Sequence, residues 1–71
     1  MNLEALQEAR ALFDAGTTQF QSRNMSSALR SFEKASSLAR ANKLPVTEVK
    51  ALYGIGNVYK YLLRFREALA T

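Results

Sequence analysis

Residues 11–16 read ALFDAG and residues 51–56 read ALYGIG, so one pattern returns after 40 residues. The same offset aligns the Ala-Leu pair at 28–29 with the Ala-Leu pair at 68–69. Further matches of identical or similar type are Glu8 with Glu48, Arg10 with Lys50, Phe13 with Tyr53, and Met25 with Phe65. A period of this length is typical of stacked supersecondary units that cover one another's apolar faces.

The spacing of apolar residues by three and four positions predicts helices throughout and no strand. We expect helices over residues 3–20, about 26–41 and about 47–63, with a fourth helix beginning at residue 65. The buried faces expected are Leu6, Ala9, Phe13, Gly16 and Phe20 on the first helix; Ala28, Leu29, Phe32, Ala35 and Leu38 or Ala39 on the second; and Val49, Leu52, Tyr53, Ile55, Gly56, Tyr59 and Leu62 or Leu63 on the third.

Turns are expected between these helices. Residues 22–24 break the first apolar pattern, and Asn24 or Ser26 can cap the helix that follows. Residues 42–45 form the second turn, since the proline there lacks an amide hydrogen and restricts the residue before it. By the 40-residue offset, Arg64 marks a third turn.

Composition limits the kinds of protein this chain can be. With 71 residues it forms one small domain, 1–71, which buries only roughly 60% of its unfolded surface. The chain has no Cys and no His, so we expect no disulfide, no metal site and no cofactor. No stretch approaches the roughly 20 apolar residues that span a bilayer, and the N-terminus lacks the pattern of a secretory signal. We expect a soluble, cytoplasmic protein that does not contact membranes.

The aligned residues resemble the tetratricopeptide (TPR) repeat, a helix-turn-helix unit with Leu, Gly and Tyr in its first helix and Ala, Phe and Pro later. Residues 52–59 read LxxIGxxY and precede Ala-Leu at 68–69, whereas residues 12–16 read LxxAG and residues 28–35 read AxxxFxxA. The period exceeds the usual ~34 residues, as in the extended TPR repeats of certain cell-polarity and signalling scaffolds. Gln19 stands where an aromatic residue is expected, and we expect Phe20 to fill that space.

The resemblance implies an all-α tandem helix-turn-helix array of three full helices plus the start of a fourth. Repeat 1 covers about 8–44 and repeat 2 about 48–71, the latter incomplete. Gly16 and Gly56 lie within helices, where each glycine costs about 1 kcal/mol relative to Ala, so we expect both to admit a closely packed neighbouring helix.

The counterpart of Phe32 in the second repeat would fall one position beyond Thr71, so the second unit lacks most of its second helix. We expect either a fragment of a longer array or a homo-oligomer, a dimer or larger, whose copies exchange or stack helices. The residues expected to mediate self-association are Tyr59, Leu62, Leu63, Phe65 and Leu69.

The sequence offers little for catalysis, and we expect no enzymatic activity. Residues 54–56 read GIG but lie inside a helical pattern with no third glycine and no preceding strand, so they do not predict a dinucleotide-binding loop. The serine pairs at 26–27 and 36–37 have no general base beside them and read as capping or surface residues.

Binding is the function that the resemblance implies, because the first helix of each TPR repeat lines a concave groove. By matched position the groove residues are Arg10, Phe13, Thr17, Phe20, Gln21, Lys50, Tyr53, Asn57, Lys60 and Tyr61. This basic and aromatic set predicts a protein or peptide partner, extended or helical, with acidic and apolar residues. The family's carboxylate clamp for chaperone C-termini needs Lys and Asn where this chain has Phe13 and Thr17; only Asn57 fits.

Two other functions stay open. The cations Arg30, Lys34 and Arg40 on the second helix could bind nucleic-acid phosphates, although Glu33 interrupts them and no specific recognition motif is present. Alternatively the chain is a purely structural, homo-oligomerising repeat. Nonspecific phosphate binding should weaken steeply with added salt, which separates the first of these from peptide binding.

Overall fold

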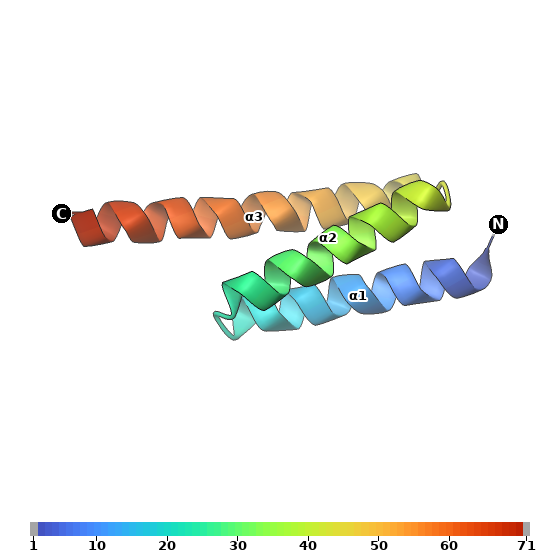
Figure 1. Ribbon diagram of the computed structural model, residues 1–71, viewed down its shortest axis with the longest axis horizontal. Coiled ribbons are helices and arrows are strands. Elements are labelled where there is room, and N and C mark those ends of the chain that lie inside the picture. The colour runs from blue at the N-terminus through green and yellow to red at the C-terminus, as the bar shows by residue number, and fades with distance from the viewer. Residues whose placement is uncertain (1, 71) are drawn as a thin grey trace.

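Residues 2–70, which the computed structural model describes, form three α-helices and no strand (Figure 1). The helices are α1 (Leu3–Gln21), α2 (Met25–Ala41) and α3 (Pro45–Ala70). α1 and α3 run in the same direction, α2 runs opposite to them, and all three pack against one another. The predicted all-α class is confirmed; Met1 and Thr71, the ends of the predicted domain, lie outside the described residues. Within residues 2–70, no helix combines the length and apolarity needed to cross a bilayer.

Side chains of asparagine cap the first two helices. The Asn2 side-chain oxygen accepts a hydrogen bond from the Ala5 amide (3.1 Å), and that of Asn24 accepts one from the Ser27 amide (3.4 Å). The predicted cap at Asn24 is therefore confirmed. Pro45 is the first residue of α3, where its missing amide hydrogen costs nothing because the first amides of a helix have no partner within it.

Both turns between helices have the same hydrogen-bond pattern. The amide-to-carbonyl bonds are Asn24 to Gln19 (2.9 Å), Arg23 to Phe20 (3.0 Å), Leu44 to Ala39 (2.8 Å) and Lys43 to Arg40 (3.2 Å). This is the Schellman motif, in which the first residue beyond the helix cap adopts a left-handed backbone. That residue is Arg23 in one turn and Lys43 in the other, with φ of 67° and 55°. Two non-glycine residues thus occupy positions that favour glycine.

We expect Lys43→Gly to stabilise the protein by up to about 1 kcal/mol, because it removes the left-handed penalty of about 1–2 kcal/mol at the cost of a more flexible unfolded chain. The melting temperature, followed by circular dichroism, should rise by a few degrees. Ala41→Gly, two positions earlier and inside the helix, is the matched control and should lower it. Equal losses for both variants would contradict this interpretation of the turn.

The core is built around one aromatic ring from α2. Phe32 is 3% exposed and forms a buried cluster with Met25, Ala28 and Val58. The helices on both sides approach this ring through glycine: a Cβ added at Gly16 would lie 2.7 Å from the ring, and one at Gly54 would lie 2.8 Å from it. The predicted close approach at Gly16 is confirmed, as is the buried face of α2.

Gln19 occupies the position where the resemblance expects an aromatic residue. Its side-chain oxygen accepts a hydrogen bond from the Ser31 hydroxyl of α2 (2.7 Å), so a polar contact joins the two helices there. Phe20 is partly buried and packs against the core cluster, which agrees with the prediction that it fills the neighbouring space.

The face that α3 buries is not the predicted one. Its buried residues are Thr47, Ala51, Gly54 and Val58. Of the predicted residues, Ile55 is partly buried and packs against the core cluster, whereas the other large ones are exposed: Val49, Leu52, Tyr53, Tyr59, Leu62 and Leu63. Gly56, predicted to admit a neighbouring helix, is exposed, and a Cβ added there would meet nothing within 4 Å. Gly54 admits the neighbouring helix instead. Residues two positions apart lie on nearly opposite sides of a helix, so Gly54 and Gly56 cannot both face α2.

The predicted turn at Arg64 and the fourth helix are wrong for the described residues: α3 continues without a break to Ala70. Residues 62–70 contain no glycine or proline, and a turn there would need a packed partner to stabilise it. The C-terminal part of α3 instead projects beyond the α1–α2 turn (Figure 1). Ala68, the repeat counterpart of the buried Ala28, is consequently exposed.

Candidate functional site

Two adjoining cavities lie between α1 and α3, and Phe13 lines both of them. Parallel alignment of the two helices brings residues 40 positions apart in sequence onto one surface. We call this surface the α1–α3 groove. It has one charged cavity and one apolar cavity.

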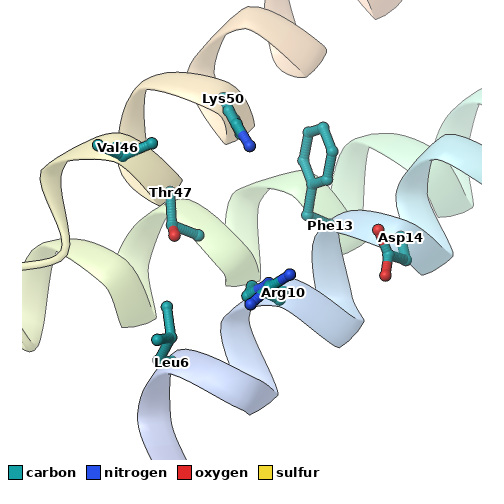
Figure 2. Close-up of a pocket in the computed structure, with 7 residues that line it drawn as sticks. All are labelled: Leu6, Arg10, Phe13, Asp14, Val46, Thr47 and Lys50. Carbon is teal, nitrogen blue, oxygen red and sulfur yellow. The ribbon is translucent and has the colours of Figure 1, made fainter. Parts of the chain in front are cut away.

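The charged cavity measures about 340 Å³. Its lining residues are Leu6, Arg10, Phe13 and Asp14 of α1 and Val46, Thr47 and Lys50 of α3 (Figure 2). Figure 2 shows the Lys50 ammonium group directed into the space between the helices, with the Phe13 ring beside it and Arg10 across from it on α1. Neither Arg10 nor Lys50 forms an ion pair with another described residue. Two cations therefore face one cavity together with one carboxylate, that of Asp14, and neither cation is held in an ion pair with it.

The apolar cavity measures about 190 Å³, enough for one side chain of the size of Leu, Met or Phe. Its lining residues are Phe13, Thr17, Phe20 and Phe32 together with Tyr53, Gly54 and Asn57 of α3. Aromatic rings make up most of the wall, and Phe13 and Phe32 contact each other with ring centroids 5.6 Å apart. The Thr17 hydroxyl donates to the Phe13 carbonyl of its own helix (3.1 Å) and so keeps only acceptor capacity for a ligand.

Most of the residues predicted to form a groove come together here. Seven line the two cavities: Arg10, Phe13, Thr17, Phe20, Lys50, Tyr53 and Asn57. Gln21 and Lys60 are exposed, and among the described residues neither lines these cavities.

Tyr61, the tenth predicted residue, lies in an aromatic row beside Phe20. Its ring contacts Phe20 edge-on (centroids 6.1 Å apart) and stacks on Phe65 (6.4 Å). The Arg23 guanidinium lies over the same ring at 5.5 Å from its centroid, a cation–π contact. Because Phe20 also lines the apolar cavity, this row adjoins that end of the groove.

Several lining residues were not predicted, and helical spacing explains most of them. Leu6 and Asp14 lie four positions on either side of Arg10, and Val46 lies four positions before Lys50, so each shares a face with a predicted residue. Phe32 and Gly54 reach the groove from the core side. That contact depends on where α2 crosses α3, which sequence spacing does not give.

The cations of α2 lie on a different surface. Arg30 and Lys34 line a shallow depression together with Glu8 and Glu33, so two carboxylates accompany two cations. Arg40 pairs with Glu48 of α3 at 2.7 Å. The predicted basic row is thus interrupted by acidic residues from three helices.

The residues predicted to mediate self-association are exposed along the C-terminal half of α3. Their exposed fractions are 54% for Tyr59, 37% for Leu62, 57% for Leu63, 52% for Phe65 and 72% for Leu69. Exposure of large apolar side chains to water is energetically unfavourable, and a contiguous set of them is typical of an interaction surface.

No family model, curated protein or solved structure matches this chain. The TPR resemblance therefore stays a prediction from the repeated residues.

Proposed function

We propose that this protein is a binding module that holds an acidic, apolar peptide segment of another protein in the α1–α3 groove. The observation that carries the proposal is the charged cavity in which Arg10 and Lys50, both without an ion-pair partner among the described residues, face the same space. A carboxylate side chain can be held there by both cations. A surface lined by α1 and α3 is compatible with the TPR resemblance, which implies that the first helices of successive repeats line the binding surface.

The adjoining apolar cavity supplies the second half of the recognition. Aromatic walls give contact area to one buried ligand side chain, and such anchors contribute most of the binding energy of peptide interfaces. Charges at the rim contribute mainly to the association rate and to the choice of partner. A ligand with an apolar residue one or two helical turns from an acidic residue fits both cavities.

Binding rather than catalysis is proposed, because the groove pairs cations with aromatic rings and offers no nucleophile with an adjacent base. Phosphate binding through α2 is the weaker candidate. Two carboxylates, Glu8 and Glu33, lie beside Arg30 and Lys34 and reduce the positive potential that a nucleic acid requires, whereas the groove cations have one carboxylate, Asp14, beside them.

We expect Arg10→Glu with Lys50→Glu to weaken binding of an acidic peptide roughly tenfold or more, since each lost attraction and each new repulsion at an exposed site is worth about 0.2–1 kcal/mol. The probes are fluorescein-labelled peptides of Glu and Leu or Phe, with Lys replacing Glu in the control peptides. Fluorescence anisotropy gives the affinities.

The matched control is Arg30→Glu with Lys34→Glu. It makes the same change in net charge on the other surface, from +4 to 0, and should leave peptide affinity nearly unchanged. Circular dichroism checks that both variants keep their helix content. Equal weakening by the two double variants would show that net charge, and not the groove, attracts the peptide.

A further inference from the structure

A second surface of α3 carries apolar residues that none of the described residues covers. It runs along the side of the helix away from the core, and its residues recur at alternating intervals of three and four. We call these residues the outer strip: Val49, Leu52, Gly56, Tyr59, Leu63 and Arg66. The four large apolar members are between 44 and 65% exposed, and Gly56 faces open space. The same spacing of apolar residues is typical of the contact seam of a two-helix coiled coil.

The outer strip is distinct from the groove. Lys50, Gly54 and Asn57 of the groove lie on another side of α3, whereas Tyr53, which lines the apolar cavity, borders the strip. A partner for the strip is therefore a second feature of the molecule, and Tyr53 is shared between the two surfaces.

We propose that the outer strip binds the outer strip of a second copy of this chain, with the two α3 helices antiparallel. In this arrangement Leu52 lies opposite the partner's Leu63, and Gly56 lies opposite the partner's Tyr59. A twofold axis repeats each contact, as an interface between identical surfaces requires. Gly56, the smallest residue of the strip, thus packs against Tyr59, the bulkiest apolar one, and the two helices are complementary in shape.

The charged residues are compatible with the same arrangement. Arg66 lies opposite the partner's Val49 with Glu48 next to it, and this carboxylate, which pairs with Arg40 of its own chain at 2.7 Å, would be shared by two cations. On one flank Ile55 faces the partner's Leu62, and on the other Tyr53 lies beside the partner's Lys60, a cation–π pairing. A parallel pair would place Arg66 against the partner's Arg66 and leave a gap between the two copies of Gly56. The strip is therefore complementary to itself in one orientation only.

Sedimentation equilibrium tests the association. The wild-type mass should rise with concentration from 7.9 kDa toward twice that value. Gly56→Leu has room in the single chain, because nothing lies within 4 Å of an added Cβ, but it would crowd the partner's Tyr59 and should weaken the dimer at least about tenfold. Adding Tyr59→Ala to Gly56→Leu should restore association, because position 56 of one copy meets position 59 of the other. A chain that stays monomeric at all concentrations would overturn the proposal and leave the strip to a different protein.

Disulfide cross-linking tests the orientation of the two α3 helices. The wild-type chain has no cysteine, so only the introduced cysteines can react. Under oxidation, a mixture of Leu52→Cys and Leu63→Cys chains should form a disulfide between the two variants, whereas each variant alone should cross-link poorly. Ala11→Cys, exposed on α1, measures random collision. Efficient cross-linking of Leu52→Cys with itself, or cross-linking of the mixture no faster than Ala11→Cys, would contradict the antiparallel dimer.

Discussion

We expect Phe32→Ala to lower the free energy of unfolding by about 3–5 kcal/mol, because it removes the ring at the centre of the core and leaves a cavity. Phe32 is the only buried aromatic residue among residues 2–70, and all three helices reach it. A domain of 71 residues has a total stability of roughly 4–10 kcal/mol. The variant should therefore melt more than about 15 °C below the wild type, or be unfolded at room temperature.

Thermal and urea unfolding followed by circular dichroism measure this effect. Tyr53→Ala is the matched control, since it removes an aromatic ring of similar size that is 72% exposed. It should change stability by no more than about 0.5 kcal/mol. A Phe32→Ala variant that melts within a few degrees of the wild type would show that the helices do not meet at this ring.

The second large effect is expected from Gly54→Leu, which should destabilise the protein by about 3 kcal/mol. A Cβ at this position would already lie 2.8 Å from two ring atoms of Phe32, and the rest of the leucine side chain needs more space. The ring cannot retreat easily, because it is buried, contacts Phe13 and lies equally close to Gly16. Crowding a packed core costs about 1–3 kcal/mol and sometimes more, which exceeds the helix-propensity gain of about 0.8 kcal/mol.

The same substitution two positions later provides the comparison. Gly56→Leu gains the same propensity but meets open space, so the dilute, monomeric protein should become more stable by up to about 1 kcal/mol. Opposite signs for the two variants are the expected result in urea unfolding at low protein concentration. The reverse order would mean that α2 crosses α3 on the other face, as the 40-residue repeat predicts for Gly56.

The sequence predicts α1 and α2 better than α3, because α1 and α2 each have a single apolar face that packs against a neighbouring helix. For α1 and α2 the predicted bounds agree within one residue, because each has a cap, a turn and a covered apolar face. For α3, apolar residues occupy two faces, and spacing alone does not tell which one α2 contacts. Ala51, Gly54 and Val58 share the buried face at intervals of three and four, but they are smaller and less apolar than the residues of the exposed strip.

The groove was largely predictable, because it depends on two helices that run side by side in the same direction. Matched positions in the two repeats identify two pairs of residues. Arg10 and Lys50 both line the charged cavity, and Phe13 and Tyr53 both line the apolar cavity. Gln21 and Lys60 were included by the same matching but are exposed outside the cavities. The contribution of α2 through Phe32 could not be predicted, since it depends on the angle at which the helices cross.

The most direct test of the proposed function is an amide NMR titration of the wild-type chain with an acidic, apolar peptide. The amides of Gly54 and Gly56 serve as reporters from opposite sides of α3, one in the groove and one on the outer strip. We expect saturable shifts at Thr17, Lys50, Gly54 and Asn57, with Gly56 nearly unchanged. No shifts at all, or shifts confined to Arg30, Lys34 and their neighbours on α2, would contradict a binding function for the α1–α3 groove.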